Sequence, residues 1–380
     1  MLSSPYCLPW DRLNRRQGET ELTALIFVLG LVTLVFGAQI LIRGASKLAL
    51  SFGISPLVLG LTIVAFGTSA PELAVSVRSA WGGQVGIALG NVVGSNIFNV
   101  LFILGLSAII APLVVAPQLI RQEVSIMVGA SVLLFALALD GGISRPDGAL
   151  LFGLLVTYTV FLIRQSRKET QSTKDEYAAE FAAPQGAAWD SHWGIQLLLI
   201  AGGLGLLVLG AHWLVEAAVS FARALGLNEM VIGLTIVAAG TSLPEVATSV
   251  IATLRGERDI AVGNVIGSNT FNILGVLGLS SLVAPAALPV APVMLSFDLF
   301  VMIAVAVACL PIFFSGHAID RWEGIVFLFY YAAYTAFLLL AAQQHDALTT
   351  YGAAMTMFVL PLTAITLAVI TLRQWRARRR

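Results

Sequence analysis

Two short polar clusters interrupt the apolar stretches of this 380-residue chain, and each cluster occurs twice. The first reads Gly-Thr-Ser-x-Pro-Glu, at residues 67–72 and again at 240–245. The second reads Gly-Ser-Asn-x-Phe-Asn, at 94–99 and again at 267–272. Together they supply carboxylate, hydroxyl and amide oxygens, with no histidine or cysteine among them. Hard oxygen ligands of this kind suit Ca²⁺ and Na⁺, and they do not suit Zn²⁺ or Cu⁺.

The two glutamates of the first cluster, Glu72 and Glu245, carry the strongest indication of function. Each lies in the middle of an apolar stretch, where a lone carboxylate costs at least about 2.5 kcal/mol in a membrane. One interpretation is a protonated glutamate that caps a freed backbone amide. Cation binding accounts better for the same acid in the same context in both copies.

A proline precedes each of these glutamates, at Pro71 and Pro244. A proline inside a helix removes one backbone hydrogen bond and kinks the helix. Gly67 and Gly240, four residues earlier, loosen the same turn. This pattern predicts a broken helix whose carbonyls turn inward, as in transporters that bind small cations. An ordinary packing kink is the alternative.

The other polar residues of the clusters fall in helical register. Thr68 and Glu72 are four residues apart and share a helix face, with Ser69 one position round. Ser95 and Asn99 have the same spacing.

Asn96 and Asn269 are as well explained by interhelical hydrogen bonding as by ion binding. Two pairs of glycines form G-x-x-x-G steps, Gly90 with Gly94 and Gly263 with Gly267. These steps are expected to permit close helix packing.

The composition indicates a polytopic membrane protein. Hydrophobic residues make up 58% of the chain, charged residues 11%, and the mean hydropathy is +0.90. A secreted domain, a nucleic-acid binder and a soluble enzyme all fit poorly, and two cysteines exclude a disulfide framework. Each spanning helix needs about 20 apolar residues. Such runs lie near 22–43, 55–77, 85–111, 122–140, 146–164, 193–222, 229–253, 260–284, 294–314, 323–342 and 355–372.

The distribution of Lys and Arg predicts the orientation. If the spans alternate, six of the 21 basic residues lie on the side of the N-terminus and the other 15 on the opposite side. The richer side is then cytoplasmic, with the N-terminus outside and the C-terminus inside. We expect a multi-pass protein of the cell (inner) membrane. Asp298, near the start of a span, is expected to have an interfacial or structural role, and its position would let it reach the headgroups.

An internal repeat covers the polar clusters. Residues 56–107 align without a gap to residues 229–280, with 31 of the 52 positions identical. The copies begin five spans apart, and because five is odd, the second copy is expected to be inserted upside down. Inverted repeats are typical of secondary transporters, whose substrate site lies near the bilayer midplane between the repeats. A channel is the less favoured alternative.

The predicted fold class is therefore all-α: two inverted five-helix repeats and an extra C-terminal helix. The expected segments are a polar extension (1–21), a first repeat (22–164), a cytoplasmic linker (165–191), a second repeat (192–343), and an extra helix with a basic tail (344–380).

At these clusters the sequence resembles the cation/calcium exchanger superfamily, specifically the prokaryotic type of sodium/calcium exchanger. The resemblance implies an antiporter in which Glu72 and Glu245 form a central site shared by Ca²⁺ and Na⁺. Spans 1 and 6 resemble that family's sliding gate helices. The implied metal-binding set is Glu72, Glu245, Asn99, Asn272, Thr68, Ser69, Thr241, Ser242, Ser95, Ser268 and the carbonyls of Ala65 and Ala238.

Departures from the family pattern refine this expectation. Some members have an aspartate at the position of Asn272, which one branch ties to K⁺ use, so its absence favours independence of K⁺. The usual core has ten spans, and the role of an eleventh is not explained. We expect Ca²⁺, Na⁺ and the lipid bilayer as partners, a functional monomer, no nucleic acid, no cofactor and no enzymatic activity. The rival functions are Ca²⁺/H⁺ antiport, a cation channel and a membrane enzyme.

Overall fold

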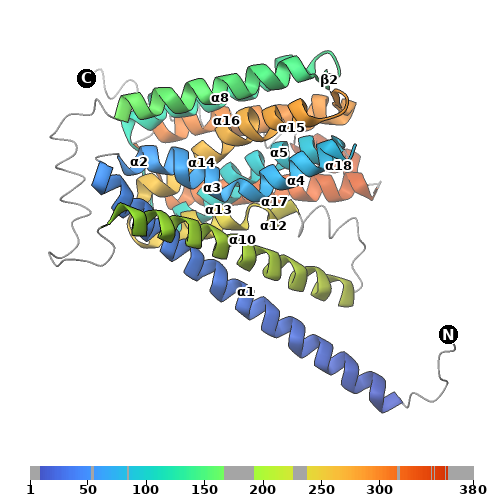
Figure 1. Ribbon diagram of the computed structural model, residues 1–380. Helices are drawn as coiled ribbons and strands as arrows, with labels where there is room; N and C mark the ends of the chain where they lie inside the picture. The colour runs from blue at the N-terminus through green and yellow to red at the C-terminus, as the bar shows by residue number, and fades with distance from the viewer. Residues whose placement is uncertain are drawn as a thin grey trace.

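The computed structural model describes residues 9–52, 55–83, 85–166, 192–225, 238–314, 317–343 and 347–355, together with 345 and 357. This part of the chain is almost entirely helical (Figure 1). Eight of its helices are long and apolar enough to cross a bilayer, and the bent pair Leu57–Thr68 and Ala70–Trp81 makes a ninth if counted as one span. The expected helical, polytopic class is confirmed. The predicted span at 355–372 and the predicted linker at 165–191 both lie almost wholly outside the described residues.

The first half of the chain begins with one very long helix and continues through shorter helices, several of which contain wider π-helical turns. Its elements are α1 (Pro9–Phe52), α2 (Pro56–Leu59), η1 (Gly60–Val64), α3 (Ala65–Thr68), α4 (Ala70–Trp81), α5 (Val85–Phe98), η2 (Asn99–Leu104), α6 (Gly105–Ile110), β1 (Leu113–Val114), η3 (Leu119–Glu123), α7 (Val124–Ala138), β2 (Gly142–Ile143) and α8 (Arg145–Ser166).

The second half has a closely similar order. Its elements are α10 (Trp193–Ala224), α12 (Ala238–Gly240), α13 (Leu243–Leu254), α14 (Arg258–Phe271), η5 (Asn272–Leu277), α15 (Gly278–Val283), β3 (Leu288–Pro289), η6 (Met294–Asp298), α16 (Leu299–Phe314), β4 (Ala318–Ile319), α17 (Arg321–Ala342) and α18 (Ala347–Ala354).

The repeated sequence produces repeated elements of equal length. Helix α13 begins at Leu243 where α4 begins at Ala70, a shift of 173 residues, and the same shift relates α5 to α14, η2 to η5, and α6 to α15. A π-helical turn starts at Asn99 in one copy and at Asn272 in the other. Such turns occur frequently at functional sites.

Two short antiparallel ladders join the halves. Strand β1 pairs with β4, and β2 pairs with β3. Each ladder therefore takes one strand from each half. Under the predicted alternation of spans, the two strands of each ladder emerge on the same side of the membrane.

The helix break expected near the prolines lies at the preceding serine. Helix α3 ends at Thr68, Ser69 leaves helical geometry with φ −82° and ψ 10°, and the two helical segments meet at 47°. Ser242 has nearly the same geometry, with φ −89° and ψ 8°. Pro71 lies in the first turn of α4, where its missing N–H leaves no helical bond unmade. Each glutamate thus lies in the first turn of a new helix, where the helix dipole favours negative charge.

Helices α1 and α10 lie side by side, oblique to the remaining helices (Figure 1). Glycines at intervals of seven residues bring their backbones together. A Cβ built on Gly37 would lie 2.8 Å from the backbone nitrogen of Leu207, and one built on Gly210 would lie 2.5 Å from that of Leu34. Close approach of this kind is how small residues hold membrane helices together. The two longest helices among the described residues therefore form one packed pair.

The expected packing role of the G-x-x-x-G steps holds for one copy. A Cβ on Gly267 would lie 2.8 Å from the backbone of Leu61, and one on Gly263 would lie 3.1 Å from the carbonyl oxygen of Leu57. A Cβ built on Gly94 would have no atom of a described residue within 4 Å, apart from its own helix. The matching partner segment, at 226–237, lies outside the described residues.

Glu257, in the turn between α13 and α14, is tied to α1. Ser46 Oγ donates to its Oε2 at 2.8 Å, and burial raises its pKa above the ordinary 4.5 despite the Ser46 bond and Arg255 nearby. A carboxyl with a raised folded-state pKa binds more protons folded than unfolded, so its contribution to stability declines as pH rises from about 4.5 through that pKa. The melting temperature of the wild type, measured in detergent, should therefore fall between pH 5 and 8. We expect this fall to be smaller in Glu257→Gln, which lacks the titrating carboxyl. A variant whose pH profile parallels the wild type would contradict this.

Candidate functional site

The two repeated glutamates lie together in the protein interior and are bonded crosswise between the halves. Glu72 and Glu245 are both 0% exposed. Ser242 Oγ donates to Glu72 Oε1 at 2.8 Å, and Ser69 Oγ donates to Glu245 Oε1 at 2.9 Å. Each serine lies at the helix break of its own half and donates to the acid of the other half. The breaks in α3–α4 and α12–α13 therefore meet at one centre.

The asparagines of the second cluster form a matching crossed network. Asn99 Nδ2 donates to Asn269 Oδ1 at 3.0 Å, and Asn272 Nδ2 donates to Asn96 Oδ1 at 3.2 Å. Asn96 Nδ2 donates to the backbone oxygen of Asn269 at 3.3 Å, and Asn269 Nδ2 returns the contact to Asn96 at 3.1 Å. Asn96 and Asn269 thus serve as hydrogen-bonding partners between α5 and α14, which is one of the two roles that the sequence allowed.

Several buried oxygens in these clusters have no hydrogen-bond partner among the described residues. Buried polar atoms are nearly always paired, so each exception needs an explanation. The exceptions come in symmetric pairs, at equivalent positions of the two repeats. Within the clusters they are Oε2 of Glu72 and Glu245, Oδ1 of Asn99 and Asn272, and Oγ of Ser95 and Ser268. A bound cation would satisfy such acceptors.

The threonines of the first cluster contact the opposite half as well. Thr68 Oγ1 lies 3.1 Å from Asn264 Oδ1, and Thr241 Oγ1 lies 3.3 Å from Asn91 Oδ1. Thr68 is fully buried and Thr241 is half-buried. Each threonine also interacts with the glutamate of the other half, Thr68 with Glu245 and Thr241 with Glu72.

Asn91 and Asn264 were not anticipated as part of the site. Asn91 Nδ2 donates to Ser76 Oγ at 3.0 Å and to the backbone oxygen of Glu72 at 3.3 Å. Asn264 Nδ2 makes the equivalent contacts with Ser249 at 3.0 Å and with Glu245 at 3.5 Å. Both asparagines and both serines are identical in the two repeats, and that identity is the sequence feature that could have revealed them.

The resemblance implies backbone carbonyls of Ala65 and Ala238 as ligands, and the structure describes the hydrogen bonds of only the first. Ala65 O accepts from the Ser69 N–H at 3.0 Å and from Thr68 Oγ1 at 3.3 Å. Ala238 begins α12, at the edge of the described residues, and its part in the site stays a prediction.

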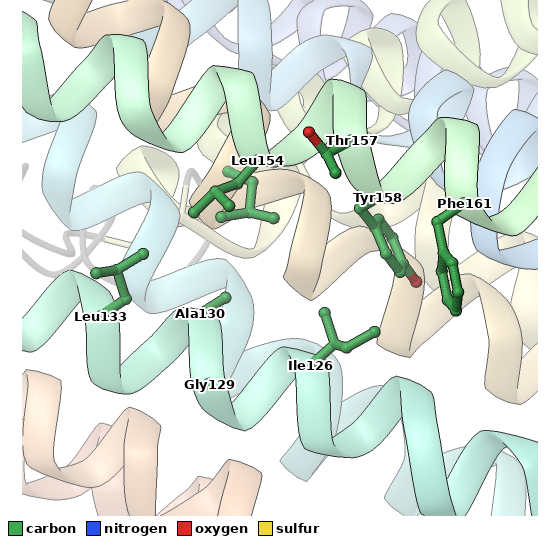
Figure 2. A pocket seen from close by; sticks show the side chains of 9 residues that line it. Ile126, Gly129, Ala130, Leu133, Leu154, Thr157, Tyr158 and Phe161 are labelled. Carbon is green, nitrogen blue, oxygen red and sulfur yellow. The ribbon is translucent and has the colours of Figure 1, made fainter.

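An apolar cavity of about 340 Å³ lies elsewhere, between α7 and α8. Figure 2 shows Tyr158 and Phe161 extending from α8 toward Ile126 on α7. Its lining is almost entirely apolar, so it offers no cage of oxygens to a cation. The polar centre between the halves is the better candidate site.

The charge available at that centre limits what it can hold. Among the described residues, no group of three or more His, Cys, Asp or Glu side chains converges in a way that could hold a metal ion. The centre instead offers two carboxylates with neutral hydroxyl and amide oxygens around them. When both acids are ionised, one divalent or two monovalent cations balance them. Oxygen ligands of this kind fit Ca²⁺ and Na⁺.

Comparison with known proteins places the chain in a family. The sequence profile of the family described as "Sodium/calcium exchanger protein" matches residues 22–164 and 195–340. The sodium/calcium exchanger MaX1 of Methanosarcina acetivorans is 36% identical over 344 residues, covering 83% of this chain and 97% of the relative. The inner membrane protein YrbG of Escherichia coli (strain K12) is 36% identical over 288 residues, covering 75% and 87%.

The fold is shared with a solved transporter of the same kind. A structure of the sodium-calcium exchanger NCX_Mj, soaked with zero Na⁺ and Ca²⁺, aligns with a TM-score of 0.71 at 31% identity, covering 84% of this chain and 99% of that one. The fold is therefore that of a cation-exchanging membrane transporter. Because the family profile matches both halves and the chain covers 97% of the exchanger MaX1, the chain belongs to the sodium/calcium exchanger protein family.

Proposed function

We propose that the protein is an antiporter that exchanges Na⁺ for Ca²⁺ across the membrane by alternating access. The observation that carries the proposal is the crossed pair of buried glutamates, each with one oxygen bonded to a serine and the other unpartnered. Family membership supports cation and Ca²⁺ exchange. The choice of Na⁺ as the counter-ion is our proposal.

The unpartnered oxygens suggest how ligand roles are divided. We assign the central site to Glu72 and Glu245, with the amide oxygens of Asn99 and Asn272 beside them. The flanking Na⁺ sites use hydroxyls and carbonyls of the remaining implied residues. These are Thr68, Ser69, Thr241, Ser242, Ser95, Ser268, Ala65 and Ala238.

Exchange rather than leak follows from the charge of the site. One Ca²⁺ or two Na⁺ neutralise the same two carboxylates, so the loads exclude each other. The unloaded site holds two negative charges away from water, and burying unpaired charge is costly. The empty carrier therefore crosses poorly between its two states, and ion movement in one direction requires ion movement in the other.

The packed pair of α1 and α10 is our candidate for the moving element. Both helices contact α13, which carries Glu245, and they lie oblique to the other helices (Figure 1). We propose that the pair slides against the ion-binding helices to expose the centre to one side at a time. The distribution of basic residues supports an outside N-terminus and a cytoplasmic linker and C-terminus.

The neutral amide at Asn272 supports independence of K⁺. A third acid at this position would add one negative charge for a further cation to balance. We also propose that one chain suffices for transport, because the polar centre is assembled from the two halves of a single chain. No cofactor is required in this account.

The counter-ion test distinguishes this function from its rivals. We expect Ca²⁺ uptake into proteoliposomes to require an outward Na⁺ gradient, to be unaffected by replacing K⁺ with choline, and to stop when internal Na⁺ is replaced by choline. Empty liposomes and the Glu72→Gln variant serve as controls. Uptake driven by a pH gradient without Na⁺ would instead indicate Ca²⁺/H⁺ antiport, and uptake without any counter-ion would indicate a channel.

A further inference from the structure

Two methionines outside the repeated clusters, one on α7 and one on α16, accept hydrogen bonds from the asparagine network. Met127, on α7, is 0% exposed and Met302, on α16, is 2% exposed. Asn269 Nδ2 donates to Met127 Sδ at 3.6 Å, and Asn96 Nδ2 donates to Met302 Sδ at 3.7 Å. A thioether is a weak acceptor and never a donor, so it can meet only the NH₂ side of an amide.

These contacts fix which way the asparagine amides face. The two hydrogens of Asn269 Nδ2 have two acceptors, Met127 Sδ and the backbone oxygen of Asn96. Its Oδ1 therefore faces Asn99 and accepts from Asn99 Nδ2. If the Asn269 amide turned over, its NH₂ would face the NH₂ of Asn99, where there would be two donors and no acceptor. Its oxygen would then face the sulfur of Met127, where there would be two acceptors and no donor.

The same constraint then passes to the proposed ion ligands. Because Asn99 Nδ2 donates its hydrogen bond to Asn269, Asn99 Oδ1 remains the unpartnered atom of that amide. Asn272 is constrained in the same way by Asn96, which Met302 contacts. Each thioether therefore orients one asparagine amide, and that amide in turn orients the amide of a second asparagine, whose oxygen stays unpartnered.

One helical turn before each methionine, an acid accepts a hydrogen bond from a tyrosine of another helix. Glu123 Oε2 accepts from Tyr158 OH at 2.5 Å, and Asp298 Oδ1 accepts from Tyr334 OH at 2.8 Å. Glu123 ends η3 before α7, and Asp298 ends η6 before α16. Asp298, which was expected to reach the headgroups, is half-buried and hydrogen-bonded to α17. The two acid–tyrosine pairs fix the rotation of the helices that present the methionines.

We propose that Met127 and Met302 are positioning residues that orient the amides of Asn99 and Asn272 with their oxygens toward the ion. This inference rests on the proposed function, because it concerns ligands of the same site. The thioether does not touch the ion and acts through Asn269 or Asn96. A leucine has a similar volume without an acceptor, so Met→Leu separates orientation from packing.

The test is Ca²⁺ transport and Ca²⁺ binding by the full-length protein with Met127→Leu or Met302→Leu. We expect a three- to tenfold rise in the KM for Ca²⁺, with a maximal rate within twofold of the wild type. The expected size is that of one lost hydrogen bond. Met294→Leu, in η6, is the matched control, since its sulfur accepts no hydrogen bond among the described residues, and its KM should not change.

A double-variant comparison separates positioning from a structural role. In an Asn99→Ala background, Met127→Leu should cause no further rise in KM, because the amide it orients is gone. Met302→Leu should likewise add nothing to Asn272→Ala. Wild-type KM values in both leucine variants, or additive effects in the alanine backgrounds, would overturn the inference. A wild type that binds no Ca²⁺ by calorimetry would overturn the proposed function, and this inference with it.

Discussion

Replacing either central glutamate by glutamine is expected to abolish Na⁺-driven Ca²⁺ uptake. Glu72→Gln or Glu245→Gln keeps the shape of the side chain and removes one of two negative charges at the centre. One remaining carboxylate cannot balance Ca²⁺ in a site away from water. We expect the initial rate of ⁴⁵Ca²⁺ uptake in vesicles to drop at least a hundredfold, to the level of empty vesicles.

The loss should not come from unfolding. A glutamine removes a buried charge, and its amide oxygen can still accept from Ser242 or Ser69, so the melting temperature should stay within a few degrees of the wild type. Glu216→Gln is the matched control, because its carboxylate lies on α10, about two-thirds exposed and beside His212. Normal flux in either central variant would refute the assignment of these acids.

The second large effect is expected where α1 and α10 pack backbone to backbone. A Cβ on Gly210 would lie 2.5 Å from the backbone nitrogen of Leu34, and the backbone cannot give way as a flexible side chain can. Overpacking of this kind typically costs about 1–3 kcal/mol. We expect Gly210→Ala to lower the melting temperature and to reduce the rate of Ca²⁺ uptake at least tenfold.

Gly205→Ala provides the comparison on the same helix. Apart from its own helix, no atom of a described residue lies within 4 Å of the position that its Cβ would occupy. Alanine also has the higher helix propensity, by about 0.8–1.0 kcal/mol, so this variant should be at least as stable as the wild type. Equal stability and equal uptake rates in the two variants would contradict the packing that we describe.

Much of the candidate site follows from the sequence because the repeat marks it. The glutamates, serines and asparagines of the two clusters are buried and meet between the halves, as polar residues in apolar helices must when they are kept from lipid. The helix break was also predictable from Pro71 and Pro244. It lies at Ser69 and Ser242 because proline is well tolerated in the first turn of a helix and ends the helix before it.

Other features required the three-dimensional structure. The sequence cannot say that Ser69 bonds to Glu245 rather than to its neighbour Glu72, because this depends on how the two halves face each other. Met127 and Met302 lie outside the aligned repeat, and each resembles an ordinary core residue of an apolar helix. The hydrogen bond between Asp298 and Tyr334 could not be predicted either, since the two residues lie 36 positions apart on different helices.

The most direct measurement is equilibrium binding of ⁴⁵Ca²⁺ to the purified protein at increasing Na⁺ concentration. If two ions of Na⁺ and one of Ca²⁺ occupy the same pair of carboxylates in turn, Na⁺ will displace all bound Ca²⁺ with a Hill coefficient above one, and choline will displace none. Bound Ca²⁺ that persists at saturating Na⁺ would contradict a single shared site.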